Sequence, residues 1–204
     1  MSNVLSFFGF SKALIENGIV FSIRDFLDAD KVDALIQKLV DKTCNTKTFL
    51  GCGISRSCFS NSDSYAIKVD KTIYADADDL YAEEEYYQMQ MTLDEEYENL
   101  GWAYDNLKNA TDSSLYAHDY PQCQEEIYAY KDILKNNSHL LNKVAKIYAY
   151  SSNQLVEIVE YCSEVGYHSE ACGDLEKLFD DIHANNVGLN KQGKAVAIDF
   201  GACF

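Results

Sequence analysis

The amino-acid sequence predicts an α+β fold, because strand-like and helix-like segments come in blocks rather than in strict alternation. Thr48–Gly53 and Ser64–Val69 predict two strands joined by a turn that contains Gly, Ser and Asn. Helix-like segments follow at Asp79–Leu107 and Gln124–Lys135. A strand pair follows at Val144–Tyr150 and Gln154–Tyr161. A helix is then expected at Cys172–Asp181 and a tight hairpin at Val187–Ile198.

The first 46 residues predict a helical N-terminal extension, 1–46, ahead of a single domain over 47–204. Between Val32 and Val40 apolar residues recur every three or four positions, which places them on one face of a helix. Ser22 and Asp25 have the spacing of a capping box just before this helix.

Composition excludes several classes of protein. The chain has 204 residues, 47% of them hydrophobic, so it can build a core of its own. Its 33 Asp and Glu residues outnumber 17 Lys and Arg, and the net charge of −16 disfavours nucleic acids and anionic membrane surfaces as partners. The seven cysteines form no C-x-x-C pair, which indicates free thiols in a reducing compartment, the cytoplasm, or the host cytoplasm for a viral protein.

The negative charge is concentrated in one segment. Residues 70–119 hold fourteen acidic residues and two lysines, a net charge of −12, and the remaining residues are nearly balanced. Aromatic residues such as Trp102 are interleaved with the acidic ones. Such a segment suits either a solvated helix or a surface that binds a basic groove of another protein.

Residues able to handle phosphate and metal occur in a fixed order. Gly51 and Gly53 form a glycine-paired turn whose backbone N–H groups can approach phosphate oxygens. Lys68 ends an apolar strand segment. Asp181 and Asn186 lie five residues apart, and Asp199 follows the hairpin, so three oxygen donors can converge on a Mg²⁺ ion and a triphosphate.

From Phe49 to Gly201 these motifs resemble the protein kinase-like superfamily, in the same order. The resemblance implies a kinase-like fold in which Gly51 and Gly53 belong to the glycine-rich loop and Lys68 holds the α- and β-phosphates of ATP. Asp181 would accept the proton of the acceptor hydroxyl, and Asn186 and Asp199 would bind Mg²⁺. Val159–Cys162 resembles the hinge after the fifth strand, so the backbone of Glu160 and Cys162 would bind adenine.

The resemblance also requires a glutamate partner for Lys68 on the helix after the third strand. We assign Glu126, because its helix leads directly into the candidate fourth strand at Val144–Tyr150. Glu125 is the neighbouring alternative, and Glu83–Glu85 is the more distant one. With Glu126 as the partner, residues 73–119 are an acidic helical insertion before the αC-like helix.

Two of the departures from the family bear on the expected site and fold. Arg56 stands where the third loop glycine is expected, so a guanidinium could supplement the phosphate cradle. The sequence ends three residues after Gly201, so we expect a near-complete N-lobe and a strongly reduced C-lobe. In this it resembles minimal kinase-like proteins of bacteriophages and bacterial effectors.

Two functions follow as expectations. The first is an ATP- and Mg²⁺-dependent kinase of protein Ser/Thr hydroxyls that autophosphorylates and acts on a host protein. The second is a non-catalytic kinase-fold protein that inhibits a host defence or nucleic-acid enzyme through the acidic insertion. A small-molecule kinase is a weaker third, based on His183 two residues after Asp181. The sequence leaves open whether the chain forms a homodimer.

Overall fold

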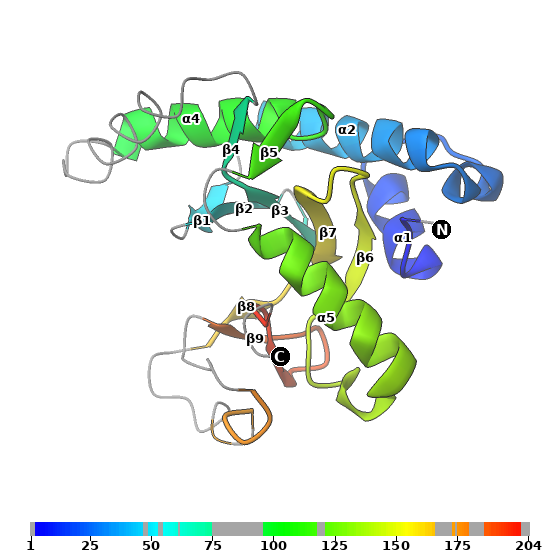
Figure 1. Ribbon diagram of the computed structural model, residues 1–204, viewed down its shortest axis with the longest axis vertical. Coiled ribbons are helices and arrows are strands. Elements are labelled where there is room, and N and C mark those ends of the chain that lie inside the picture. Colours follow the sequence, from blue (N-terminus) through cyan, green and yellow to red (C-terminus); the bar gives the residue numbers. More distant parts are fainter. Residues whose placement is uncertain are drawn as a thin grey trace.

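The computed structural model describes most of the chain, namely residues 3–46, 49–52, 55–60, 62–74, 96–117, 121–165, 173, 175–179 and 186–200. It is an α+β structure built around a five-stranded antiparallel sheet, with helices on both of its faces (Figure 1). None of the helices within these ranges has the length and apolar character needed to cross a bilayer.

The central sheet has the strand order β1-β2-β3-β7-β6, and each neighbouring pair is antiparallel. Its strands are β1 (Phe49–Cys52), β2 (Arg56–Phe59), β3 (Tyr65–Asp70), β6 (Ile147–Tyr150) and β7 (Val156–Glu160). The expected strands around Phe49, Lys68 and the 144–161 pair are confirmed. The segment between the first two is not merely a turn, because it contains β2.

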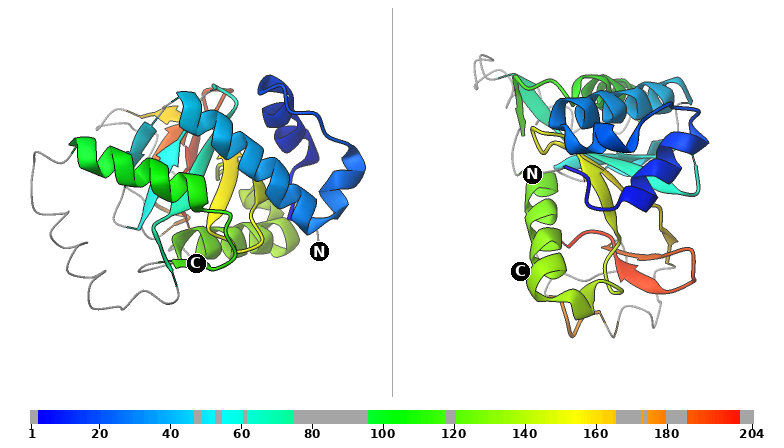
Figure 2. Two further views of the ribbon diagram at one scale, coloured as in Figure 1. Left: turned by 90° about the horizontal axis from the view of Figure 1, so that it is seen from above. Right: turned by 90° about the vertical axis from the view of Figure 1, so that its right-hand side faces the viewer.

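One face of the sheet is covered by the N-terminal helices and by α4. These are α1 (Phe7–Glu16), the 3₁₀ helix η1 (Ile23–Leu27), α2 (Ala29–Thr46) and α4 (Glu96–Asn109). Figure 2, seen from above, shows α2 and α4 lying across the strands. Alternate strand residues such as Ile67 and Ile158 join this core with Phe10 and Ile36, so residues 1–46 complete the packing of the sheet. The capping box of Ser22 and Asp25 is confirmed, and it begins η1.

The opposite face of the sheet packs against α5 (Gln122–Asn136), which matches the helix expected at Gln124–Lys135. The 3₁₀ helix η2 (Ser138–Leu140) follows α5, and a small sheet of β8 (Ser163–Glu164), β9 (Val187–Leu189) and β10 (Ala195–Ala197) lies beside α5 (Figure 1). A second core joins Ile127 and Ile133 of α5 to Val187 and Phe200. The expected hairpin at the end of the chain is therefore confirmed.

The acidic segment and residues 175–179 differ in part from what the sequence predicts. β4 (Thr72–Tyr74) and β5 (Leu115–Ala117) pair at the base of the acidic segment and bring its two ends together. Of the helix expected over Asp79–Leu107, the structure shows α4, and residues 75–95 lie outside the described ranges. The helix expected over Cys172–Asp181 is not formed at 175–179, where the chain makes turns.

Gly188 allows the β9–β10 hairpin to approach the segment after β7. A Cβ atom at this position would lie 2.6 Å from Cys162 Cβ and 3.0 Å from Ile198 Cγ2. We expect Gly188→Ala to lower the free energy of unfolding by about 1–3 kcal/mol, the usual cost of overpacking. Urea denaturation measures this change, with Gly193→Ala as the comparison, since the space around Gly193 is open and only its φ of +71° disfavours alanine. An unchanged midpoint for Gly188→Ala would contradict the close packing.

Candidate functional site

Polar side chains line the sheet face that packs against α5. The strand register places Cys58, Lys68 and Glu157 directly opposite one another on β2, β3 and β7. Arg56 is likewise opposite Asp70 on the β2–β3 pair. Residues opposite each other on antiparallel strands point to the same face, so the sequence alternation of β3 sends Lys68 and Asp70 towards α5 and Ile67 and Val69 towards the other core.

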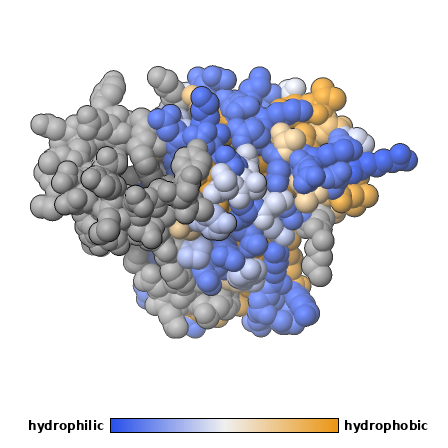
Figure 3. Space-filling model, turned by 45° about the horizontal axis from the view of Figure 1, so that its top comes forward, coloured by the Kyte–Doolittle hydropathy of each residue, from blue (hydrophilic) through white to orange (hydrophobic). Residues whose placement is uncertain are grey.

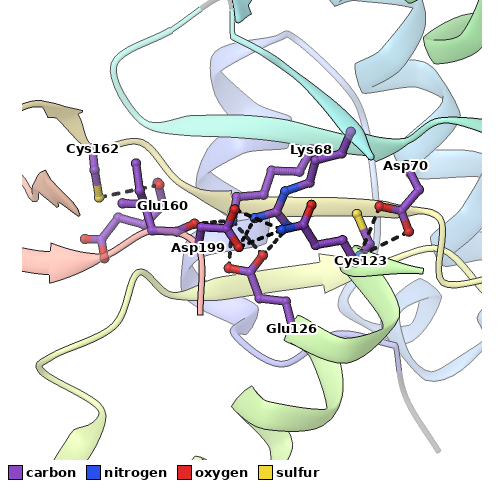
Figure 4. A network of polar contacts seen from close by, with 10 residues as sticks. Lys68, Asp70, Cys123, Glu126, Glu160, Cys162 and Asp199 are labelled. Atoms are coloured by element: carbon purple, nitrogen blue, oxygen red, sulfur yellow. Dashed lines mark hydrogen bonds and ion pairs between the residues drawn. The ribbon is translucent and has the colours of Figure 1, made fainter. Parts of the chain in front are cut away.

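Lys68 and Glu126 form a buried ion pair at the centre of this face. The Lys68 ammonium donates to both carboxylate oxygens of Glu126, with Nζ–Oε distances of 2.7 Å. Arg56 donates from Nη1 to Oε2 of the same carboxylate. The Glu126 carboxylate thus sits between two cations, and the pairing expected from the sequence is present in the structure (Figure 4).

Asp199 joins this cluster from the end of the β9–β10 hairpin. Its Oδ1 lies 2.8 Å from Arg56 Nη2, and Gln122 Nε2 donates to both carboxylate oxygens at 3.0 Å. The backbone carbonyl of Ile198 accepts a hydrogen bond from Lys68 Nζ. Arg56 therefore links Glu126 to Asp199, and Figure 4 shows these carboxylates converging from α5 and from the hairpin.

The neighbouring charges set the protonation of the cluster. Burial lowers the pKa of Lys68, as does Arg56, but Glu126, Glu157 and Asp199 together raise it above its ordinary value. Burial raises the pKa of Asp199, yet the adjacent Arg56 and Lys68 charges hold it below its usual range. The cluster accordingly holds ionised Lys68, Arg56 and Asp199 at neutral pH.

Glu157 is a buried carboxyl beside this cluster. Neither of its carboxyl oxygens has a hydrogen-bond partner among the described residues, and its side chain is fully buried. Burial and the nearby Glu126 carboxylate raise the pKa of Glu157 well above its ordinary value. The neutral form of Glu157 is thereby favoured.

Asp70 fixes the start of α5 to β3. Its carboxylate accepts from the backbone N–H of Cys123 at 3.0 and 3.1 Å, which satisfies one of the free donors at the helix N-terminus. Asn106 of α4 donates to the Asp70 carbonyl at 2.8 Å. The Asp70–Cys123 hydrogen bonds hold the start of α5, and with it Gln122 and Glu126, against the strand that carries Lys68.

Asp70 also makes stability depend on pH. Burial raises the pKa of its carboxyl to about 6, although the Cys123 N–H group lowers it. The folded state thus binds this proton more tightly than the unfolded state, so Asp70 contributes stability that is present below pH 3.8 and is lost as pH rises through about 6.

We expect Asp70→Asn to reduce the stability difference between pH 4 and pH 7 by about 3 kcal/mol, from 1.4 kcal/mol for each pKa unit. The asparagine oxygen can still accept from Cys123 N–H, so the helix start is retained. Urea denaturation at a series of pH values measures the change, with Asp105→Asn, at an exposed position of α4, as the comparison. An unaltered pH profile for Asp70→Asn would contradict the account of its buried charge.

The residues expected to bind adenine lie where β7 ends. Glu160 N donates to the carbonyl of Lys146 at 2.8 Å, and Lys146 Nζ lies 3.8 Å from Glu160 Oε1. The Cys162 thiol donates to the Glu160 carbonyl at an S–O distance of 3.8 Å. Burial, with the Glu160 carboxylate, raises the pKa of Cys162 to about 12, so the thiol stays protonated.

Of the remaining residues expected in the site, the structure describes Asn186 and Gly51. Asn186 lies at the open end of the hairpin, where Ile198 N donates to its carbonyl at 2.8 Å and brings it next to the strand end that carries Asp199. Gly51, at a bulge of β1 with φ of +157°, is opposite Cys58 and thus in the same row of the sheet as Lys68. Gly53 and Asp181 lie outside the described residues.

Sequence reasoning did not identify the roles of Arg56, Gln122, Glu157 and Asp70 in this cluster. A detectable signal existed for Asp70, since Lys68 and Asp70 are two positions apart on one strand and therefore share a face. The described part of the chain has no group of three or more His, Cys, Asp and Glu residues that could hold a metal ion. No family model, curated protein or solved structure matches the chain.

Proposed function

We propose that this chain is a minimal protein kinase-like phosphotransferase that uses ATP and Mg²⁺ to phosphorylate protein hydroxyls, including its own. The observation that carries the proposal is the buried ion pair between Lys68 of β3 and Glu126 of α5, with Asp199 in the same hydrogen-bonded cluster. A lysine on the third strand, a glutamate on the helix packed against it and an aspartate after a hairpin are the arrangement that phosphate transfer in this superfamily requires.

In this proposal Lys68 binds the α- and β-phosphates, and Glu126 orients its ammonium. Fixing a long side chain beforehand avoids the entropy cost of ordering it when the nucleotide binds. Glu160 and Cys162 offer their backbone to adenine at the end of β7, and the turn with Gly51 and Gly53 covers the phosphates.

Asp199 and Asn186 are the residues that would hold Mg²⁺. Their carboxylate and amide oxygens are the hard donors that this ion prefers, and the hydrogen bond from Ile198 N to Asn186 O brings the two positions together. The bound ion would neutralise charge on the β- and γ-phosphates. Asp199 would hold the ion in place of its contacts with Arg56 and Gln122, and the Arg56 guanidinium would then be able to contact a phosphate.

The transfer step itself depends on Asp181. Its carboxylate takes the proton of the acceptor hydroxyl while that oxygen bonds to the γ-phosphorus. The bond from the γ-phosphorus to its bridging oxygen breaks, and ADP leaves with the electron pair.

Incubation with γ-labelled ATP tests the proposal. We expect label on the protein itself, and loss of that label in Asp181→Ala. Asp180→Ala is the matched control, since it removes a neighbouring carboxylate and is expected to retain the label. Absence of transfer by the wild type, both to itself and to a host lysate, would refute phosphotransfer.

A second function is favoured by one specific contact set. Both oxygens of Asp199 already accept hydrogen bonds from protein groups, so the cluster is satisfied without a nucleotide. This favours a non-catalytic protein on the same scaffold, acting on a host defence or nucleic-acid enzyme through its acidic insertion. Persistent biological effect of Lys68→Ala and Asp199→Ala, together with its loss on deletion of residues 76–94, which leaves α4 and β5 in place, would support this second function over the first.

A further inference from the structure

Exposed apolar side chains gather on α1 and η1. Of the eleven large hydrophobic residues that are exposed in the described part of the chain, six lie between residues 7 and 27, namely Phe7, Phe8, Ile15, Val20, Ile23 and Leu27. We call these six residues the α1–η1 patch. Figure 3 shows hydrophobic surface collected at the right of the molecule, where Figure 1 places α1 and the start of α2.

The helix that carries much of this patch is held firmly from its inner side. Leu5 N and Ser6 N donate to the carbonyl of Tyr148 at 2.8 and 3.0 Å, and Ser6 caps α1. A Cβ atom at Gly9 would lie 2.3 Å from the Tyr148 ring, so the α1 backbone rests directly on β6. The opposite side of α1 therefore faces outward in a fixed orientation.

The outward side of α1 continues onto η1. Phe8, Ser11 and Ile15 follow one another at spacings of three and four residues, which places them on one stripe of the helix. The Phe7 ring lies 5.7 Å from the Phe26 ring, centroid to centroid, and Phe26 is the buried residue of η1. This contact joins the α1 stripe to the segment that carries Ile23 and Leu27.

The size of the α1–η1 patch matches one side of a protein–protein interface. Its side chains are 47–89% exposed. At about 150–200 Å² for each when fully exposed, they present roughly 700 Å² of apolar surface. The largest apolar patch of a typical monomer is about 300–600 Å², and one partner in a stable complex contributes about 800 Å².

The charge around the patch is balanced, unlike that of the chain. Residues 3–31 contain three cationic and four anionic side chains, Lys12, Arg24 and Lys31 with Glu16, Asp25, Asp28 and Asp30, against a net charge of −16 for the whole sequence. Residues 3–31 therefore offer little net electrostatic attraction to a strongly basic or strongly acidic partner. Lys12 Nζ lies 3.8 Å from Glu16 Oε1 within one copy. A two-fold axis that places this pair beside the same pair of a second copy makes the surface complementary to itself.

We propose that the α1–η1 patch is the interface of a homodimer, in which the Phe8–Ile15 stripe of one copy packs antiparallel against the same stripe of a second copy. Ser11, at the middle of the stripe, is small and lets the two helices approach. The interface lies across the sheet from Lys68 and Glu126, so this inference does not depend on the proposed enzymatic function.

Sedimentation velocity of the full chain between about 1 and 100 μM tests the proposal. We expect a dimer for the wild type and a monomer for the double variant Phe8→Asp with Ile15→Asp. Tyr116→Asp is the matched control, because it puts the same charge on an exposed apolar residue of β5 and is expected to leave the dimer intact. A monomeric wild type over the whole range, or a double variant that still dimerises, would overturn the proposal.

Hydrogen exchange of the wild type gives a second test that needs no variant. We expect amides of residues 7–27 to exchange more slowly at 100 μM than at 1 μM, with those of α5 unchanged. Equal exchange at both concentrations would overturn the proposal. A monomer that co-sediments with phosphatidylcholine vesicles would likewise overturn it, in favour of a bilayer as the occupant of the patch.

Discussion

Replacing Glu126 with Gln is expected to lower the free energy of unfolding by about 3–5 kcal/mol, the cost of removing one partner from a buried ion pair. The carboxylate is fully buried and lies between Lys68 and Arg56. Without its charge, two buried cations stay close together, and Asp199 remains as the anion beside Arg56. Urea denaturation at pH 7 measures the loss.

Glu125→Gln is the matched control for this variant. Glu125 is the preceding residue of α5, and only partly buried, so the same change of charge is expected to cost less than about 0.5 kcal/mol. Equal losses for the two variants would contradict the assignment of Glu126 as the partner of Lys68. The comparison thus also decides between the two neighbouring glutamates that the sequence offers.

Replacing Lys68 with Met is expected to reduce phosphate transfer by about 10²–10³, the effect of removing one positioned donor to developing charge. The expected loss of stability is smaller than that of Glu126→Gln, because Glu126 keeps its contact with Arg56. Glu126→Gln is therefore expected to lower stability more than Lys68→Met does.

Steady-state transfer of label from γ-labelled ATP measures the Lys68→Met effect. Lys135→Met is the control, since it removes an exposed lysine from the last turn of α5 and is expected to keep full activity. Transfer by Lys68→Met within a few-fold of the wild type would argue against Lys68 as the phosphate-binding residue.

Much of the fold could be predicted because its long elements have clear patterns. The apolar stripe from Val32 to Val40 is the buried face of α2. The short loop of the β9–β10 hairpin consists of turn residues that include Gly193. β2 was missed because Arg56 and Ser57 begin it and neither is a strand-type residue. The burial of Arg56 is explained by its ion pairs with the distant residues Glu126 and Asp199, which a local pattern does not record.

Part of the candidate site could be predicted from the order of the elements along the chain. Chain order alone led to Glu126, because its helix precedes the strand at Val144–Tyr150, and the ion pair is present. Arg56 was expected only as a supplement to a phosphate loop, yet it lies between Glu126 and Asp199. Glu157 gave no signal, because a glutamate within an apolar strand of an antiparallel sheet usually faces solvent.

The N-terminal region also shows what a sequence pattern leaves out. Periodicity identified the helical character of residues 1–46 and thereby suggested an extension. Periodicity did not reveal that these helices cover one face of the sheet. That packing depends on β3 and β7, whose alternate residues form an apolar face for the helices while the other residues face α5. Both strands are buried along their full length, as expected for a sheet covered on both sides.

Thermal unfolding with ATP, in the presence and absence of Mg²⁺, tests the central claim most directly. At ATP concentrations near 100 times Kd, binding adds about 2.7 kcal/mol, which corresponds to a rise in Tm of about 5–10 °C for a chain of this size. We predict that this rise requires Mg²⁺ and is lost in Asp199→Asn, measured against the variant's own Tm. No shift in the wild type under either condition, or an equal shift in Asp199→Asn, would contradict a nucleotide site built on Lys68, Glu126 and Asp199.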